Sequence, residues 1–340
     1  MARRLQLYPE TPLILMYHRV ADLASDPWGL AVPPLLFEEQ LAFLKHRRLV
    51  LPLAEFGQLH ECGRLPAKAI AITFDDGYAC NATTAAPLLE KYGLPATIFL
   101  ATAFISSDQE FWWDALERIV MCAETDRLGL VINGTTASIA LGRRDERSSA
   151  SCWAATMKPE STRQSAYLKL WSRLRVAGDR ERRQAIEDLH RQAGTSASPR
   201  QSHRIITAAE VRRIASSGLI EIGAHTVTHP VLNQLNREEQ RLEITQSRDR
   251  CRELVGHLPK AFAYPFGEYD DDSVAIVKEA GFDIACTTQS FGIGASSRVL
   301  QMPRSAVGAW NASELAAAMY RLNPEERAGD ADRLTSLRAQ

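Results

Sequence analysis

Seven short apolar runs, separated by segments with a helical spacing of apolar residues, constrain the fold of this chain most strongly. Each run is four to six residues long and rich in aliphatic and β-branched side chains. Strands that are buried on both faces of a parallel sheet have this composition. The predicted strands are residues 13–17, 69–74, 96–101, 219–223, 261–264, 283–287 and 299–302. Strands alternating with helices predict an α/β fold whose parallel sheet is either open or closed into a barrel.

The segment from about 104 to 205 interrupts this alternation. Phe111-Trp112-Trp113 opens one helical pattern, and two later Arg-rich stretches also have helical spacing. The polar stretch 142–151 between them predicts a loop. We therefore expect a single α/β domain over residues 11–320 that a helical insertion interrupts, followed by a frayed tail over 324–340.

The charge balance and the apolar pattern exclude several classes of partner. The chain has 40 basic and 41 acidic residues, so there is no positive excess that would attract nucleic acid or an anionic membrane. No run is long and apolar enough for a transmembrane helix or a signal peptide, and we expect a cytoplasmic protein. The six cysteines form no Cys-x-x-Cys pair, which predicts free thiols. Nothing in the pattern indicates an oligomeric state.

Two adjacent carboxylates, Asp75 and Asp76, follow the predicted strand 69–74. The carboxyl end of a parallel strand is where ligands bind, and like charges are costly there unless a cation offsets them. Gly77 then allows a sharp turn. The alternative is a simple turn in which one Asp caps a helix.

Two histidines, His225 and His229, follow the predicted strand 219–223. Histidines four apart on a helical turn face the same way and both reach one metal ion. Taken alone, the pair is also typical of two surface histidines. Together with Asp76, it predicts a metal site of two imidazoles and one carboxylate.

These two motifs resemble those of the polysaccharide deacetylase family, also called NodB homology or carbohydrate esterase 4. Residues 73–77 read Thr-Phe-Asp-Asp-Gly, and residues 225–229 read His-Thr-Val-Thr-His. The resemblance covers roughly 11–103 and 205–310. It implies a distorted (β/α)7-type barrel with the site at the carboxyl ends of its strands.

The resemblance also implies roles for these residues. Asp75 would be the general base that takes a proton from the attacking water. Asp76, His225 and His229 would be the ligands of a divalent metal. Zn²⁺ suits this set best, while Co²⁺, Ni²⁺, Fe²⁺ and Mn²⁺ remain alternatives.

The third family motif is altered in this chain. Residues 262–267 read Phe-Ala-Tyr-Pro-Phe-Gly, and Ala263 stands where relatives carry the arginine that holds the catalytic Asp. We expect Arg304 to supply that charge from a later strand, although a surface residue or a structural ion pair is the alternative. The backbone N–H of Phe266 would serve as an oxyanion donor.

The general acid of the family is a histidine near the C-terminus, and no histidine follows His257 here. The run Leu-Met-Tyr-His at 15–18 resembles the permuted poly-N-acetylglucosamine deacetylases, in which this histidine comes first. We therefore assign His18 as the acid. A core histidine with a structural hydrogen bond is the alternative.

The expected function is removal of N-acetyl groups from an amino-sugar-containing glycan or glycoconjugate. An O-acetyl esterase or a non-sugar amidase would use the same metal chemistry, and a carbohydrate-binding protein without activity is a further alternative. Trp112 and Trp113 are candidates for a wall on which a sugar ring stacks, and packing of the insertion explains them equally well.

Overall fold

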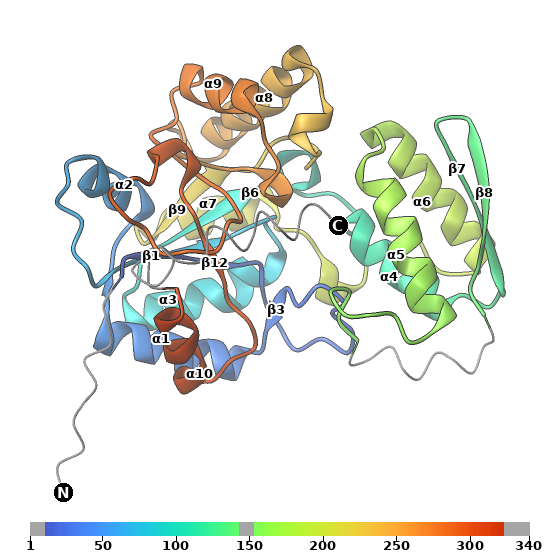
Figure 1. Cartoon of the computed structure of the whole chain (residues 1–340), viewed down its shortest axis with the longest axis horizontal. Coiled ribbons are helices and arrows are strands. Elements are labelled where there is room, and N and C mark those ends of the chain that lie inside the picture. Colours follow the sequence, from blue (N-terminus) through green and yellow to red (C-terminus); the bar gives the residue numbers. More distant parts are fainter. Residues whose placement is uncertain (1–10, 143–152, 323–340) are drawn as a thin grey trace, which may run out of the picture.

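The computed structural model describes residues 11–142 and 153–322 and contains a central parallel sheet (Figure 1). The strand order is β11-β10-β9-β6-β5-β1-β12, with β4 beside β5. These strands are β1 (Leu13–Tyr17), β4 (Leu49–Val50), β5 (Ala69–Phe74), β6 (Ala96–Leu100), β9 (Ile220–Ala224), β10 (Ala261–Ala263), β11 (Ile284–Cys286) and β12 (Ser305–Ala306). Apart from β4, and from β12, which pairs with the first strand β1, neighbours in the sheet follow one another along the chain, as in a (β/α) barrel.

The sheet curls toward closure through the segment that leads into β12. A parallel bridge joins Cys286 at the end of β11 to Met302, and β12 pairs with β1. The expected barrel-type α/β fold is therefore confirmed. The predicted strand at 299–302 is wrong, because Val299–Gln301 forms a 3₁₀ turn and only Met302 bridges to the sheet. Pro303 follows and has no N–H to continue a ladder.

Helices cover the outside of the sheet (Figure 1). They are α1 (Pro34–Arg47), α2 (Leu53–Glu61), α3 (Ala86–Tyr92), α7 (Ala208–Ala215), α8 (Arg237–Val255), α9 (Asp271–Glu279) and α10 (Ala312–Tyr320). Capping boxes begin four of them, including Thr207 with Glu210 at α7. Both α3 and α8 end at a left-handed glycine, Gly93 and Gly256.

Inward-facing side chains of several strands fill the barrel, and the ring of Phe99 is one of them. Ile14, Ala71, Phe99 and Ala263 belong to this inner cluster. A Cβ on Gly223 would lie 2.4 Å from the ring of Phe99, so only glycine leaves room for it. The ring of Phe99 thus forms a floor below the carboxyl ends of the strands.

The insertion lies beside the barrel (Figure 1). Its elements are α4 (Trp112–Cys122), β7 (Arg127–Ile132), β8 (Thr135–Ala140), α5 (Thr162–Arg175) and α6 (Asp179–Ala193). The β7–β8 hairpin was not anticipated, although Asn133-Gly134 is a strong signal for a two-residue hairpin turn, and both residues have positive φ. Most of the predicted loop at 142–151, and the tail at 324–340, lie outside the described residues.

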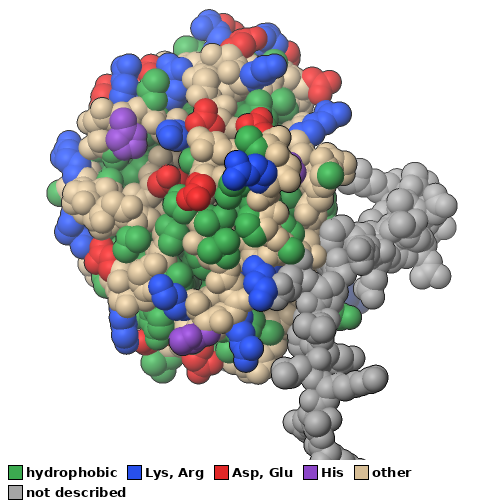
Figure 2. All heavy atoms as spheres, turned by 90° about the vertical axis from the view of Figure 1, so that its left-hand side faces the viewer, with side chains coloured by type: hydrophobic (Ala, Val, Ile, Leu, Met, Phe, Trp, Pro, Cys, Tyr) green, Lys and Arg blue, Asp and Glu red, His purple; other side chains and the backbone are tan. Residues whose placement is uncertain are grey.

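The surface agrees with the even charge balance. On the face shown in Figure 2, acidic and basic side chains are interspersed around a group of hydrophobic ones.

The cysteines that the structure describes are all unpaired. A two-strand pair, β2 (Arg19–Val20) with β3 (Ala31–Val32), extends the chain from β1 toward the insertion. None of the described helices has both the length and the apolar character needed to cross a bilayer.

Candidate active site

Three of the predicted site residues follow the inward-facing register of their strands. Side chains alternate along a strand, so residues two apart share a face. Met16 pairs with Thr73, which places His18 next to Asp75 two residues further on. His225 directly follows Ala224 at the end of β9 and lies inward like Gly223. The alternation that builds the barrel interior therefore also brings these side chains together.

Asp75 is held by Arg304. The guanidinium donates from Nη1 and Nη2 to the two carboxylate oxygens at 2.6 and 2.7 Å, and its Nε donates to the carbonyl of Thr287. Arg304 is fully buried, 5.5 Å above the ring of Phe99. Burial would raise the pKa of Asp75, but Arg304 and the nearby histidines outweigh it and hold the pKa below its ordinary value. The sequence predicted this partner, and the structure brings the two side chains together.

Asp76 occupies a tight turn that aims it at the two histidines. Its φ is 72°, a left-handed conformation that is costly for a residue with a side chain. Gly77 follows with φ 85°, and a Cβ there would lie 2.7 Å from Leu100. Adjacent carboxylates thereby point in different directions, Asp75 toward Arg304 and Asp76 toward His225 and His229.

The buried side chains of Asp76, His225 and His229 converge as a metal site requires. Nε2 of His225 and of His229 lie 3.7 and 3.4 Å from Oδ1 of Asp76. Tetrahedral ligands about 2.1 Å from a zinc ion lie about 3.4 Å from one another. Burial and the neighbouring Asp75 raise the pKa of Asp76 well above its usual value, so a cation is the partner that favours its ionised form. The donor set therefore fits a divalent metal.

The two imidazoles are oriented differently. Nδ1 of His225 donates to the carbonyl of Ala263 at 2.7 Å, which leaves Nε2 free to bind a metal. Nδ1 of His229 is buried and has no hydrogen-bond partner within the described structure. Its ring packs instead against Trp113 and Phe266, with centroids 5.0 and 4.6 Å away. Burial lowers the pKa of both histidines, which favours the neutral form that ligates.

His18 lies at the edge of the same pocket. Its Nε2 is 4.0 Å from Oδ2 of Asp75. Burial lowers the pKa of His18 to about 4, despite the opposing effect of Asp75. The resting imidazole is therefore neutral at pH 7, and it must receive a proton before it acts as an acid.

Phe266 follows β10 in a strained turn. Its φ is 56°, and its ring lines the pocket. Among the described residues, nothing accepts a hydrogen bond from its N–H. The structure thus leaves this donor free, as the predicted oxyanion role requires.

A pocket of about 430 Å³ contains these residues and has aromatic walls. Trp113 lines it, as one of the two candidates for a sugar-stacking wall. Trp112 does not, because its side chain turns away into a second pocket between α4 and α6. Two pocket tryptophans were missed, Trp28 from the loop after β2 and Trp171 from α5, whose rings lie 4.5 Å apart. Neither has a motif around it, and only the packing of the insertion brings them to the site.

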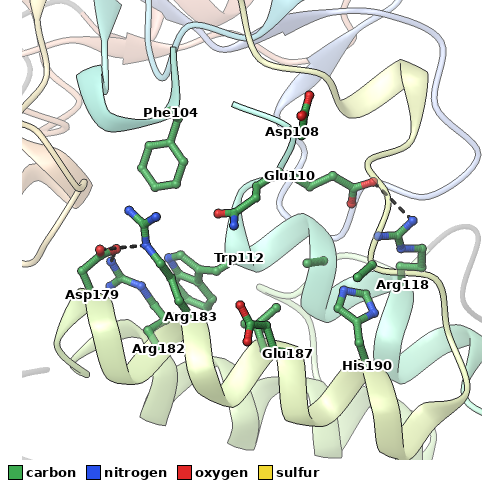
Figure 3. A pocket seen from close by; sticks show the side chains of 14 residues that line it. Phe104, Asp108, Glu110, Trp112, Arg118, Asp179, Arg182, Arg183, Glu187 and His190 are labelled. Carbon is green, nitrogen blue, oxygen red and sulfur yellow. Dashed lines mark hydrogen bonds and ion pairs between the residues drawn. The ribbon is translucent and has the colours of Figure 1, made fainter. Parts of the chain in front are cut away.

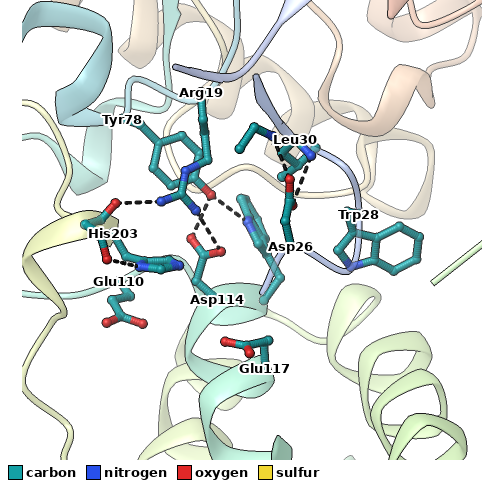
Figure 4. A network of polar contacts seen from close by, with 12 residues as sticks. Arg19, Asp26, Trp28, Leu30, Tyr78, Glu110, Asp114, Glu117 and His203 are labelled. Carbon is teal, nitrogen blue, oxygen red and sulfur yellow. Dashed lines mark hydrogen bonds and ion pairs between the residues drawn. The ribbon is translucent and has the colours of Figure 1, made fainter. Parts of the chain in front are cut away.

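Figure 4 shows a buried polar network in which Arg19 and Tyr78 both contact Asp114. Trp113 is bound to this network. The Nε1 of Trp113 donates to the hydroxyl of Tyr78, which donates to Asp114 at 2.7 Å. Arg19 stacks on the ring of Tyr78 and pairs with Asp114. Burial raises the pKa of Asp114 to about 6. Because Trp113 contacts His229, this network links the insertion to the candidate metal site.

Comparisons with known proteins match this chain to one family profile and to solved structures of the same fold. The sequence profile described as "Polysaccharide deacetylase" matches residues 63–122 and 190–285 and leaves out most of the insertion. In the deacetylase PplD from Streptococcus pyogenes, solved with acetate, the fold aligns with a TM-score of 0.57 at 19% identity. That alignment covers 92% of this chain and 99% of PplD.

Two curated relatives match over shorter segments. The poly-beta-1,6-N-acetyl-D-glucosamine N-deacetylase of Staphylococcus epidermidis is 34% identical over 118 residues, which are 31% of this chain and 41% of the relative. The peptidoglycan-N-acetylglucosamine deacetylase of Bacillus cereus is 35% identical over 74 residues, 22% of this chain and 26% of the relative. The chain therefore spans less than half the length of these relatives.

Proposed function

We propose, from the match of this chain to the polysaccharide deacetylase profile, that it is a metal-dependent hydrolase that removes N-acetyl groups from an amino-sugar-containing glycan or glycoconjugate. One observation carries the proposal: the Asp75–Arg304 pair adjoins the Asp76, His225 and His229 cluster in one pocket. A proton acceptor and a metal-ligand set side by side are what hydrolysis of an amide needs.

Each group has a part in this reaction. A divalent cation held by Asp76, His225 and His229 would polarise the acyl carbonyl and lower the pKa of water. Asp75, kept ionised by Arg304, accepts a proton from the attacking water. The free N–H of Phe266 stabilises negative charge on the acyl oxygen.

The leaving amine needs a proton, which we route through His18. The resting His18 is neutral, and the pKa of Asp75 lies below its ordinary value. In this proposal, the proton that Asp75 takes from water reaches Nε2 of His18 through one bridging water, because the imidazole lies 4.0 Å from Oδ2 of Asp75. His18 then donates it to the amine, so that the carboxylate and the imidazole are both restored.

The names of the relatives favour an N-acetylglucosamine-containing substrate. Both curated relatives are named N-acetylglucosamine deacetylases. The aromatic walls of the pocket also suit the apolar face of a sugar ring. An O-acetyl ester would be cleaved by the same groups, and an assay that measures free amine separately from free hydroxyl distinguishes the two reactions.

The first test measures metal content and acetate release together. Wild type should contain about one divalent transition metal per chain, and His225→Ala and Asp76→Ala should lose it, because each removes one of three ligands. Chelation should abolish release of acetate from N-acetylglucosamine oligomers, and Zn²⁺ or Co²⁺ should restore it.

His257→Ala is the matched control, because it removes a histidine that lies outside the pocket. It should keep both metal and activity. Acetate release that persists after the metal is stripped would overturn the metal-dependent mechanism.

The aromatic wall gives a second prediction. Trp171→Ala should lower kcat/KM by about five-fold, chiefly through KM, because an aromatic contact contributes about 1 kcal/mol beyond buried area. Trp310→Ala removes a similarly half-buried tryptophan away from the pocket and should leave both constants unchanged. Equal effects of the two substitutions on KM would show that the wall does not bind substrate.

A further inference from the structure

The loop that carries both metal-ligand histidines has its central peptide groups fully hydrogen-bonded. The carbonyls of Thr226 and Val227 accept from the backbone N–H groups of Thr102 and Ala103, at 3.1 and 2.9 Å. The N–H of His229 donates to the side chain of Thr226. These contacts come from the barrel and from the loop itself. They leave the N–H groups of Val227 and Thr228 and the carbonyl of Thr228 to be satisfied from elsewhere.

Two oppositely charged side chains satisfy the remaining groups. Glu243, on α8, accepts from the N–H groups of Val227 and Thr228 at 2.8 and 2.9 Å and from the Thr228 hydroxyl at 2.7 Å. Arg182, on α6 of the insertion, donates from Nη2 to the carbonyl of Thr228 at 3.2 Å. Thr228 is therefore held between two charges from two different parts of the fold.

This loop needs such support more than an ordinary turn does. Thr226 and His229 have φ values of 65° and 55°, and each left-handed residue of this kind costs about 1 kcal/mol or more. His225 has a hydrogen bond from Nδ1 that fixes its ring, and His229 has none. The position of His229 thus depends on its backbone and on ring packing.

Arg182 is built into this position. Its side chain is 2% exposed, and its guanidinium lies 5.7 Å from the ring centroid of Trp112. Burial lowers its pKa, and Asp179 and Glu243 oppose that effect. Figure 3 shows Arg182 and Arg183 next to each other on α6, with Asp179 bonded to the pair. Only Arg182 also contacts the histidine loop.

We propose that Arg182 and Glu243 are positioning residues that clamp Thr228 and so fix His229 as a metal ligand. The insertion, most of which the family profile leaves out, is then a working part of the metal site. This inference rests on the metal site of the proposed function. If these contacts only held the insertion against the barrel, removing them would lower stability and leave metal affinity unchanged.

The test titrates metal-free full-length protein with Co²⁺, followed by visible absorption, and then competes Zn²⁺ against a chelator. Loss of the partner that hydrogen-bonds a metal-ligating side chain typically costs 10–100-fold in affinity. The clamp acts on the residue next to His229, so the lower end of that range is expected. Arg182→Met and Glu243→Ala should each weaken binding by about ten-fold or more. Glu243→Gln keeps acceptor oxygen and should lose less, and Arg182→Lys should restore part of the affinity.

Arg183→Met is the matched control. Arg183 also pairs with Asp179 and lies 5.9 Å from the ring of Phe104, but within the described residues it has no hydrogen bond to the loop. Thermal unfolding of the metal-free proteins separates lost folding from lost positioning. If Arg182→Met and Arg183→Met bind Co²⁺ equally, the clamp is refuted. If wild type itself binds no metal, the proposed function fails instead.

Discussion

Asp75→Asn should lower the rate of acetate release by about 10²–10⁴-fold, the usual contribution of a general base. Asn has nearly the same shape as Asp, but its amide does not accept a proton from water. The ligands Asp76, His225 and His229 are untouched, so metal affinity should stay within about three-fold of wild type. Steady-state kinetics of the metal-loaded variant, beside a Co²⁺ titration, measure both quantities.

The control for this prediction makes the same chemical change elsewhere. Asp270 caps α9 through hydrogen bonds to Ser273, and Asn is an equally good cap. Asp270→Asn should therefore retain full activity. An Asp75→Asn variant that keeps more than about a tenth of the wild-type rate would place the base at another residue.

Arg304→Met should have the largest effect on stability. Arg304 is fully buried, and its removal leaves the Asp75 carboxylate buried without its partner. Breaking a buried pair in this way costs about 3–5 kcal/mol. Urea unfolding of the metal-free proteins at pH 7 should show that loss. Arg237→Met breaks exposed pairs with Asp272 and Glu279 and should cost less than about 1 kcal/mol.

The loss of folding stability caused by Arg304→Met should depend on pH. In wild type the pKa of Asp75 is held below its unfolded value of about 3.9, so the ionised carboxylate stabilises the fold above that pH. Without Arg304, burial raises the pKa instead, and the ionised form destabilises the fold above the same pH. The difference between the proteins should therefore be largest near pH 7 and shrink below about pH 4.

A double-mutant cycle completes this prediction. Arg304→Met combined with Asp75→Asn leaves no unpaired charge, so it should recover part of the stability that Arg304→Met loses. The pH below which Arg304→Met loses activity should also be higher than in wild type, because Asp75, the general base, is then protonated more readily. A deficit that does not change with pH would show that Arg304 stabilises by packing alone.

The fold and its strands were largely predictable from the sequence. Parallel strands buried on both faces are continuous apolar runs, and the runs at 13–17 and 69–74 match β1 and β5 residue for residue. The run at 299–302 is similar in composition but forms no strand. The local sequence pattern does not indicate which backbone N–H and C=O groups will find hydrogen-bond partners in a neighbouring strand. The actual closing strand, Ser305–Ala306, is too short to leave a pattern.

The hairpin of the insertion was missed for a different reason. Its turn residues, Asn133 and Gly134, were a readable signal, but the helical spacing on either side dominated the interpretation. Trp28 and Trp171 left no such signal. They reach the pocket because a loop and a helix far apart in sequence pack against each other.

The sequence by itself determined which chemical groups the site contains. Asp75 and Asp76 follow one predicted strand, His225 and His229 follow another, and His18 follows the first strand of the chain. Their side chains meet because strand alternation and parallel register are local rules that bring strand ends to one edge. Only the tertiary structure decided what surrounds them. The contacts of Arg182 and Glu243 with Thr228, and the places of Trp28 and Trp171 in the pocket wall, depend on distances between segments far apart in the chain. No local spacing encodes those distances, because packing of the whole chain sets them.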